Sequence, residues 1–329
     1  MKKQIEQFVK HLGPLDRIAL LAGDASTRQY FRIFSADQTF IVCQDPDFIN
    51  QDPEDYPAFN VNHLFRRHNI RVPVIYRMDS TAGMFLLEDI GDLSLEQAAK
   101  QLDSSGLENQ YFRIIEKLTE IQTIPRTNSL PFNRSFDIEK LMFEFDFFIR
   151  HALTGYANIS LNEKNLDRLR NAFFTVAELL NEPEWFVLNH RDFHSRNIYL
   201  HDNQIVILDY QDARLGLPQY DAVSLLRDSY HVLHDDLCAR LMIFHYERMR
   251  YCGLIAFSWD EYMRYFDLMA FQRNIKAIGT FGFQVTVRGQ NTYQKYIRPS
   301  VNYLKSYIER RPELQEAAKI LNPFFEVIV

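Results

Sequence analysis

The stretch His-Arg-Asp-Phe-His-Ser-Arg-Asn at residues 190–197, followed by Ile-Val-Ile-Leu-Asp at 205–209, decides what this sequence encodes. An apolar, β-branched run that ends in an acid predicts a short buried strand with a carboxylate leaving its C-terminal end. The first stretch follows another apolar run, 185–188, and predicts a loop with an acid and an amide five residues apart. Asp192, Asn197 and Asp209 thus occur in the order that phosphoryl transfer from a metal-bound nucleotide requires.

The chemistry of phosphoryl transfer explains why these residue types are needed. The protein has little covalent work to do, and it contributes mainly positioning and neutralisation of charge. Asp192 is therefore the candidate base that accepts a proton from a substrate hydroxyl. Asn197 and Asp209 are candidate Mg²⁺ ligands, because this ion prefers hard oxygen atoms and keeps several waters. The motif predicts a kinase that uses ATP and Mg²⁺.

Other interpretations of the same loop stay open at this point. Each half of the motif alone also occurs as an ordinary turn or as the cap of a following helix. Alternation along the chain would place His190, Asp192 and His194 on one face, a pattern that can bind a transition metal. No second cluster of histidines and acids with matching spacing follows, and this disfavours a metal-dependent hydrolase.

Length and composition fit an enzyme with a small-molecule substrate. A chain of 329 residues with 47% apolar content can bury a large core, more easily as two lobes than as one. The net charge of −6 predicts no nucleic-acid partner. Three widely spaced cysteines suit a reducing compartment, and no signal peptide or membrane-spanning run is evident. We therefore expect a cytoplasmic protein without a membrane partner.

The hydrophobic pattern changes character near residue 90, and this predicts an α+β fold with two lobes. Short strands separated by turn residues are expected at 18–21, 30–34, 40–43, 72–76 and 84–87, with helices at 4–12 and 57–68. Beyond residue 94 helical spacing dominates, at 95–102, 108–122, 137–151, 164–180, 221–234, 237–251, 259–281, 293–310 and 313–321. Residues 1–90 would form a small antiparallel-sheet lobe that covers a nucleotide. Residues 91–329 would form a helical lobe with the catalytic loop and the acceptor pocket.

The turn between the first two strands is the candidate phosphate-covering segment. It reads Gly-Asp-Ala-Ser-Thr-Arg at residues 23–28, and its small residues, Ser26 among them, could turn backbone N–H groups toward phosphate oxygens. It contains a single glycine and matches neither a Walker sequence nor the glycine-rich loop of protein kinases. A plain hairpin turn would have the same appearance.

These stretches together resemble the aminoglycoside-phosphotransferase type of kinase, a branch of the protein-kinase-like fold that phosphorylates hydroxyls of small molecules. Within that family the chain is similar to the bacterial anomeric kinases of N-acetylmuramate and N-acetylglucosamine, which serve cell-wall recycling. The resemblance rests on Asp-Ala-Ser-Thr-Arg-Gln-Tyr-Phe-Arg (24–32), Phe-Leu-Leu-Glu-Asp-Ile-Gly (85–91), His-Arg-Asp (190–192), Leu-Asp-Tyr-Gln-Asp-Ala (208–213), Tyr-Asp (220–221), Ser-Leu-Leu-Arg-Asp (224–228) and Gln-Arg-Asn-Ile-Lys (272–276).

The resemblance implies roles for further residues. The backbone at Glu88 and Ile90 would meet the adenine edge, and Asp221 would brace the catalytic loop. It also assigns the roles of base and metal ligands to the residues already singled out: Asp192, Asn197 and Asp209. Protein kinases place a phosphate-binding lysine on the third strand, but here position 43 is Cys and position 44 is Gln.

A substitute for that lysine must be an arginine, because the chain has no lysine between residues 10 and 100. Arg28 and Arg32 share one face of the second predicted strand by alternation, and a guanidinium group matches phosphate geometry well. Either arginine could supply the charge. The alternative is that both lie on a solvated strand face.

The acceptor pocket is expected around Gln211, Asp212 and Arg227, with Arg273 and Lys276. The last two lie three residues apart on one predicted helical face and could meet an acidic substituent such as a lactyl carboxylate. The alternative is a basic stripe in contact with solvent. Asp235-Asp236 and Asp260-Glu261 are the adjacent acidic pairs in the helical part, and so few clustered acids disfavour polycationic aminoglycosides as substrates.

Three competing functions follow from the same residues. The acceptor could be an aminoglycoside, choline or another amino alcohol. Without the strand-three lysine, the chain could also be a catalytically silent nucleotide-binding module, although Asp192, Asn197 and Asp209 are all present. Protein phosphorylation is disfavoured, because the second acid continues as Asp-Tyr-Gln at 209–211 rather than Asp-Phe-Gly, and no Ala-Pro-Glu segment follows.

Overall fold

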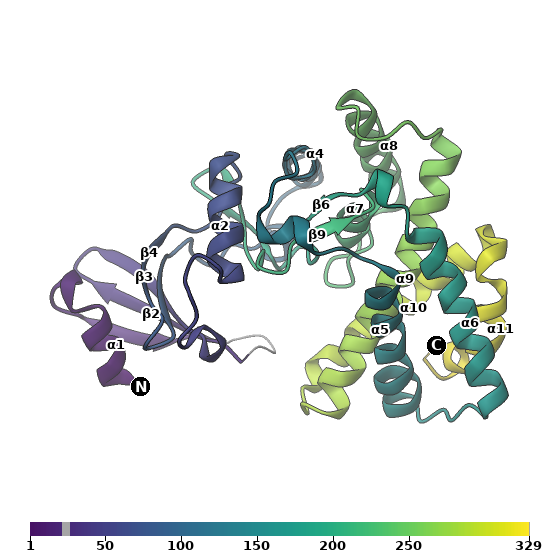
Figure 1. The fold of residues 1–329 in the computed structure, drawn as a ribbon, viewed down its shortest axis with the longest axis horizontal. Coiled ribbons are helices and arrows are strands. Elements are labelled where there is room, and N and C mark those ends of the chain that lie inside the picture. Colours follow the sequence, from purple (N-terminus) through teal and green to yellow (C-terminus); the bar gives the residue numbers. More distant parts are fainter. Residues whose placement is uncertain (22–26, 329) are drawn as a thin grey trace. The chain divides into compact units, whose positions relative to one another are not determined.

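The computed structural model describes residues 1–21 and 27–328. The chain divides into two compact units (Figure 1). The first unit comprises Met1–Ser94 and Ile198–Asp212, and the second comprises Leu95–Asn197 and Ala213–Val329. The fold is α+β, with an antiparallel sheet in the N-terminal part and a mostly helical remainder.

A five-stranded antiparallel sheet forms the centre of the first unit. Its strands lie in the order β1-β2-β3-β5-β4. They are β1 (Arg17–Leu20), β2 (Gln29–Ser35), β3 (Gln38–Gln44), β4 (Ile75–Asp79) and β5 (Met84–Glu88). The predicted strands are confirmed, except that β4 starts three residues later than expected. Pro73 accounts for the shift, because it has no N–H to donate to a ladder.

The two faces of this sheet are buried against different elements. On one face Ile33, Val42 and Leu86 pack with Ile5 and Phe8 of α1 (Lys2–Phe8). On the other face Cys43 and Phe85 pack with Phe48 and Tyr56. A strand sends alternate side chains to opposite faces, which is why neighbours such as Val42 and Cys43 belong to different clusters. Helix α2 (Pro57–Arg67) starts with proline at its first position, where the missing N–H is not needed.

A hairpin from much later in the chain also belongs to the first unit. Strands β7 (Ile198–His201) and β8 (Gln204–Ile207) pair antiparallel. Asp202 and Asn203 connect them with φ values of 49° and 59°, as a tight turn of type I′ requires. The hairpin is tied to the N-terminal segment by bonds of 2.9 Å from Leu200 N to Leu93 O and from Ile207 N to Arg71 O. Strand β8 was predicted from the sequence and β7 was not.

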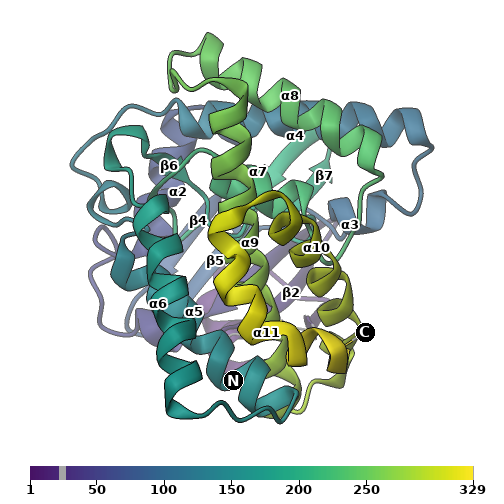
Figure 2. The same ribbon diagram turned by 90° about the vertical axis from the view of Figure 1, so that its right-hand side faces the viewer.

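The second unit is built around the 28-residue helix α9 (Trp259–Thr286). Helix α9 runs between α5 (Ile138–Phe148) and α10 (Ile297–Arg310), as Figure 2 shows. Around these three lie α3 (Leu95–Ala98), α4 (Ser104–Gln122), α6 (Glu163–Leu180), α7 (Gln219–Leu226), α8 (Asp235–Tyr251) and α11 (Gln315–Ile328). A small ladder of β6 (Val187–Asn189) and β9 (Arg214–Gly216) completes the unit.

Some predicted helices of this unit differ from the observed ones only at their ends, such as those expected at 95–102 (observed Leu95–Ala98) and 313–321 (observed Gln315–Ile328), and three differ in other ways. The helix expected at 221–234 ends at Leu226, because the Asp228 carboxylate accepts the N–H of Tyr230 and turns the chain. The helix expected at 137–151 changes to π-helical geometry over Ile149–Tyr156. The segment expected to be helical from residue 293 begins as a 3₁₀ turn, Asn291–Tyr296.

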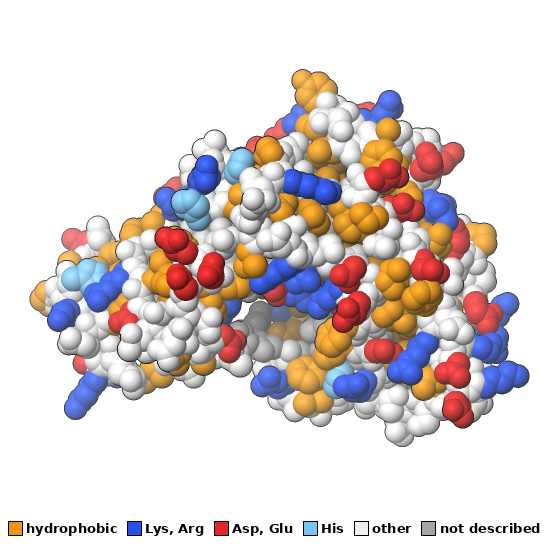
Figure 3. Space-filling view, viewed as in Figure 1, with side chains coloured by type: hydrophobic (Ala, Val, Ile, Leu, Met, Phe, Trp, Pro, Cys, Tyr) orange, Lys and Arg blue, Asp and Glu red, His pale blue; other side chains and the backbone are white. Residues whose placement is uncertain are grey.

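The face of the molecule shown in Figure 3 carries charges of both signs. On the face shown in Figure 3, acidic and basic side chains are interspersed among apolar ones. Within the part of the chain that the structure describes, no helix is both long and apolar enough to cross a membrane.

Candidate active site

The loop at residues 190–197 is anchored at its first residues by Asp221 of α7. The Asp221 carboxylate accepts the backbone N–H of His190 at 2.5 Å and that of Arg191 at 3.0 Å. Asp221 is fully buried, and burial raises its pKa even though these bonds favour the ionised form. Arg191 adopts φ of +88°, a conformation that non-glycine residues rarely take. The two bonds from Asp221 hold the strained turn in place.

A second buried aspartate anchors the far end of the loop. Asp228 follows α7, and its carboxylate accepts the N–H of Ser195 at 2.9 Å and that of Tyr230 at 2.8 Å. Burial raises the pKa of Asp228 to about 6. The loop is therefore fixed at both ends by carboxylates that belong to one short segment of the chain, residues 221–228. The sequence pattern around Asp228 gave no sign of this role, and the residue stood out only as part of the segment 224–228 that carries the family resemblance.

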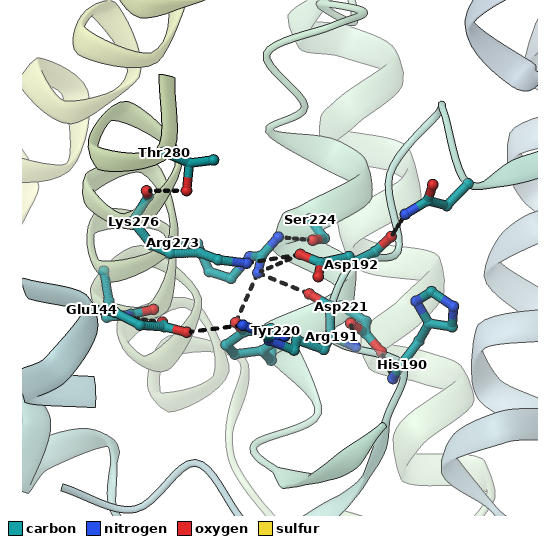
Figure 4. A network of polar contacts seen from close by, with 12 residues as sticks. Glu144, His190, Arg191, Asp192, Tyr220, Asp221, Ser224, Arg273, Lys276 and Thr280 are labelled. Carbon is teal, nitrogen blue, oxygen red and sulfur yellow. Dashed lines mark hydrogen bonds and ion pairs between the residues drawn. The ribbon is translucent and has the colours of Figure 1, made fainter. Parts of the chain in front are cut away.

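Asp192 lies between the two anchors and is paired with cations from α9 (Figure 4). Lys276 Nζ lies 2.7 Å from Asp192 Oδ1, and Arg273 NH1 lies 3.9 Å from the same oxygen. Burial alone would raise the pKa of Asp192, but the charges of Lys276, Arg191 and Arg273 outweigh it and hold the pKa well below its usual range. The carboxylate is ionised across the physiological pH range.

Asn197 is oriented by the same loop. Its side-chain nitrogen Nδ2 donates to the backbone oxygen of Asp192 at 2.9 Å. The amide oxygen therefore lies on the other side of the group, and an amide oxygen is the kind of hard ligand that Mg²⁺ accepts. Chemically, Asn197 fits the metal-ligand role predicted for it.

Arg273 holds α9 against the loop through several bonds. Its NH1 group donates to Arg191 O at 2.9 Å and to Tyr220 Oη at 2.8 Å, and its NH2 group donates to Ser224 Oγ. The side chain is 9% exposed, and that of Lys276 is 15% exposed. These values exclude the alternative of a solvated basic stripe. Arg273 is buried and Lys276 is half-buried, and both lie beside the loop.

Glu144 of α5 brings a further carboxylate to this cluster. Its Oε2 accepts from Gln272 Nε2 at 2.8 Å, and its Oε1 lies 4.0 Å from Arg191 NH2. Glu144 is 4% exposed. A buried acid within an apolar helix is a signal that could have identified this residue from the sequence, because buried charges are normally paired.

Arg196 fixes the C-terminal part of the loop by a different kind of contact. Its guanidinium lies 3.9 Å from the ring centre of Tyr230 and 5.1 Å from that of Tyr296. It also donates to Glu96 Oε2 at 2.9 Å and to Tyr296 Oη at 2.7 Å. Cation–π contacts of this kind strengthen when the cation is partly desolvated. The loop is thus held by side-chain as well as backbone bonds.

The loop histidines do not behave as a metal pair. Burial lowers the pKa of His194 to about 3, so its ring is neutral, and the ring packs edge-on against Tyr230 with centroids 5.1 Å apart. His190 packs against Phe193 in the same manner. Among residues 1–21 and 27–328, no group of three or more His, Cys, Asp or Glu side chains could hold a metal ion.

In the first unit, Asp209 follows β8 in a left-handed conformation with φ of +61°. Gln211 Nε2 donates to Asp209 Oδ1 at 2.7 Å. Tyr210 between them is anchored by Asn62, whose Nδ2 lies 2.6 Å from the Tyr210 hydroxyl. Asp212 is half-buried and ends this segment. The exposed Asp209 carboxylate offers a hard oxygen, as the predicted metal role requires.

The arginines expected to face the phosphates are paired with carboxylates of their own unit. Arg28 Nε lies 2.7 Å from Asp45 Oδ2. Arg32 lies 2.7 Å from Asp89 Oδ2 and 2.9 Å from Asp92 Oδ2. The alternative of a fully solvated strand face is therefore wrong for both side chains, which are 18% and 16% exposed. Ser26 lies outside the described residues.

The residues expected at the adenine edge lie at the end of β5. The Glu88 side chain binds the guanidinium of Arg71 and accepts the N–H of Val74 at 3.0 Å. Ile90 is buried two residues further on, at 5% exposure. The Glu88 side chain is thus occupied within the sheet, and the Glu88 backbone N–H donates to Val74 O at 2.9 Å, so the nucleotide role of this backbone stays a prediction.

Arg227 belongs to a different set of contacts from Arg273 and Lys276. Its NH1 group lies 2.6 Å from Cys238 Sγ, and its guanidinium lies 5.6 Å from the ring centre of Tyr303. It therefore bridges the end of α7 to α8 and α10. The structure brings Arg273 and Lys276 to Asp192 but gives Arg227 other partners.

Comparisons with known proteins agree on what the chain is similar to. A family profile described as the phosphotransferase enzyme family matches residues 17–252. An N-acetylmuramate/N-acetylglucosamine kinase of Neisseria meningitidis serogroup B is 30% identical over 90% of this chain and 87% of its own length. A protein of the same name from Pseudomonas aeruginosa is 27% identical over 91% of this chain and 86% of its own length.

Solved structures share the fold at low identity. The ADP-bound aminoglycoside phosphotransferase APH(2'')-Ib has a TM-score of 0.62 with 12% identity, covering both chains completely. The choline kinase LicA from Streptococcus pneumoniae has a TM-score of 0.63 with 16% identity, covering 93% of this chain and 99% of the other. The predicted protein-kinase-like fold is confirmed.

Proposed function

Because this chain belongs to the phosphotransferase enzyme family and is a small-molecule kinase, we propose that it transfers the terminal phosphoryl group of ATP to the anomeric hydroxyl of an N-acetylated amino sugar. N-acetylmuramate and N-acetylglucosamine are the proposed acceptors, because relatives that match this chain over about nine-tenths of its length are named for them.

The observation that carries the proposal is the state of Asp192. It is an ionised carboxylate on a loop that buried aspartates anchor at both ends. A positioned base can accept the proton of an attacking hydroxyl, and fixed geometry supplies much of the rate when the chemistry is mostly positioning. In the proposal Asp192 orients the sugar hydroxyl and takes its proton as the bond to phosphorus forms.

Asn197 and Asp209 are the residues that we propose to hold Mg²⁺. The argument is their hard-oxygen chemistry, together with their order after Asp192 in the chain. Bound to ATP, the ion would neutralise charge on the phosphate oxygens. The Asp192 backbone positions the Asn197 amide through the bond to Nδ2.

The nucleotide-binding roles of the first 90 residues are part of the same proposal. We propose the backbone at Glu88 and Ile90 for the adenine edge, and Ser26, Arg28 and Arg32 for the phosphates. The ion pairs of Arg28 and Arg32 bear on this, because an arginine with a carboxylate partner must share its donors or exchange that partner when it meets a phosphate.

Residues 91–329 carry the proposed acceptor chemistry. We propose Gln211, Asp212 and Arg227 as candidate sugar contacts on the family resemblance. For Arg273 and Lys276 the observed bonds favour a role toward Asp192 over direct contact with a sugar carboxylate.

A coupled ADP-release screen tests the proposed function. The purified protein with ATP and Mg²⁺ is offered N-acetylmuramate, N-acetylglucosamine, choline, ethanolamine and an aminoglycoside. We expect turnover with the N-acetylated sugars and product in which the anomeric carbon bears the phosphate, as ³¹P and ¹H NMR would show. Turnover with choline or the aminoglycoside alone would replace the acceptor assignment, and nucleotide binding without any transfer would indicate a silent module.

The matched variant for this screen is Asp192→Asn. It keeps the size of the side chain but cannot accept the proton, so kcat should fall by orders of magnitude while ATP binding persists. Unchanged turnover in this variant would contradict the assignment of the base. A circular dichroism spectrum like that of the parent protein is the control for folding.

A further inference from the structure

We infer that Lys276 of α9 is the positioning residue of Asp192: its ammonium group binds one carboxylate oxygen and leaves the other to receive the acceptor hydroxyl. This inference rests on the proposed function for the identity of the base. It replaces a direct substrate contact of Lys276 with a role exerted through Asp192.

The contact geometry is one-sided. Both cations of α9 approach Oδ1 of Asp192, with Lys276 Nζ at 2.7 Å and Arg273 NH1 at 3.9 Å. Within the described chain, neither of these ion pairs involves Oδ2 (Figure 4). A carboxylate fixed through one oxygen has its rotation about χ2 restricted, so the second oxygen points in a defined direction. A general base needs this orientation, since it must lie within hydrogen-bond reach of the proton that it takes.

Arg273 does not fill the same role, because its NH1 group, the one nearest to Asp192, and its NH2 group donate elsewhere. They bind the backbone oxygen of Arg191, the hydroxyl of Tyr220 and the hydroxyl of Ser224. Arg273 therefore fixes α9 to the loop and to α7. Lys276, one turn further along α9, is carried by that attachment to the carboxylate of Asp192.

Charge balance supports a structural need for the lysine. Asp192 is 23% exposed, and an ionised carboxylate at that depth is costly without a partner. The cation nearest to Asp192 after Lys276 is 3.9 Å away. Arg191 lies 4.0 Å from the carboxylate of Glu144, so its positive charge is divided between Glu144 and Asp192. Removal of Lys276 would thus leave Asp192 without its nearest hydrogen-bonded counter-charge.

A double-mutant cycle tests the inference. Lys276→Met and Asp192→Asn are made singly and together, and kcat and KM for the sugar and for ATP are measured. Lys276→Met should lower kcat by about 100-fold, the size of loss expected when a reacting group is misplaced by about 1 Å, with a smaller effect on the KM for ATP. In the Asp192→Asn background the same substitution should change kcat less than about threefold, because residues that act as a unit are not additive.

The matched control is Thr280→Val. Thr280 lies one turn beyond Lys276 on α9, and its hydroxyl donates to Lys276 O at 3.1 Å without contact to Asp192 (Figure 4). This variant should keep kcat within about twofold of the parent. Lys276→Arg preserves the charge and should recover part of the turnover lost in Lys276→Met. Equal fold-losses from Lys276→Met in the parent and in Asp192→Asn would overturn the inference.

Thermal unfolding of the same four proteins gives a readout that needs no turnover. Lys276→Met should lower the unfolding midpoint of the parent more than that of Asp192→Asn, where no carboxylate is left unpaired. The thermal coupling is the difference between these two changes in the unfolding midpoint. If only the proposed function is wrong, the parent protein will lack kinase activity and the thermal coupling will still be observed. Absence of the thermal coupling would sink the ion-pair inference whatever the activity.

Discussion

Gly282 lies where α9 passes closest to the π-helical turn at Ile149–Tyr156, and it gives a sharp prediction for Gly282→Ala. A Cβ atom at this position would lie 2.5 Å from His151 O and 2.9 Å from Ala152 Cα. Ordinary C···O contacts are about 3.3–3.6 Å, so the two backbones must separate by most of an ångström. Neither neighbour can rotate away, because both contacts are with backbone atoms.

The expected magnitude follows from two opposing terms. Alanine in a helix interior is favoured over glycine by about 1 kcal/mol. Overpacking of a well-packed region costs about 1–3 kcal/mol, and backbone contacts place this site at the upper end. We therefore expect Gly282→Ala to lower the free energy of unfolding by about 2 kcal/mol. Since α9 also carries Arg273 and Lys276, kcat should fall as well.

Urea unfolding followed by tryptophan fluorescence measures this change in the right part of the molecule. Trp185 and Trp259 are the only tryptophans, and both belong to the second unit. Ala277→Gly on the same helix is the control for helix propensity, and it should cost about 1 kcal/mol. A Gly282→Ala protein as stable as its parent would refute the close-approach argument.

Three further predictions concern titration and the anchored loop. The buried His245 has its pKa lowered by burial to about 3, so its stabilising effect is complete above pH 6.5 and is lost as the pH falls toward 3. Between pH 7 and 5 the parent should lose about 2 kcal/mol through this group, a loss that pH-dependent urea unfolding of His245→Gln should not show. Asp228, with its pKa raised from 3.8 to about 6, holds its proton more tightly when folded, so its contribution declines as the pH rises from about 4 to about 6. Asp228→Asn should therefore gain about 2 kcal/mol relative to the parent between pH 4 and pH 7, and an unchanged difference would contradict the raised pKa. Arg196→Met should cost more free energy of activation, calculated from kcat, than free energy of unfolding, because it frees the end of the loop. Steady-state kinetics and a thermal melt of the same variant would check this.

The sequence predicted most of the fold because its signals were local. The strands of the first unit are short apolar runs bounded by turn residues, as in β3 and β5, and α9 keeps an apolar surface over many turns. Strand β9, with three residues, is too short to show a period, and it forms only because β6 lies beside it. Strand β7 was missed although Asp202-Asn203 is a turn signal, because Asp-Asn is a weaker hairpin pair than Asn-Gly.

The candidate site was predicted less completely, and the reason is distance along the chain. The spacing of Asp192 and Asn197 is a local pattern, and the structure links these residues directly. The pairing of Asp192 with Lys276 joins positions 84 residues apart, and no single-sequence pattern encodes such a pair. The solvated-stripe alternative for Arg273 and Lys276 was wrong for the same reason: helical periodicity showed that they share a face but not what that face meets.

The β7–β8 hairpin has a consequence for any attempt to divide this protein. The polypeptide passes from one unit to the other after residues 94, 197 and 212, so the first unit is not a contiguous piece of chain. A fragment that stops at residue 94 would leave the carbonyls of Arg71 and Leu93 without the strand partners that residues 198–212 provide. Unpaired carbonyls and an uncovered apolar surface favour aggregation of such a fragment. Reconstitution would therefore require the hairpin as a second peptide, or a permuted chain in which residues 198–212 directly follow residue 94.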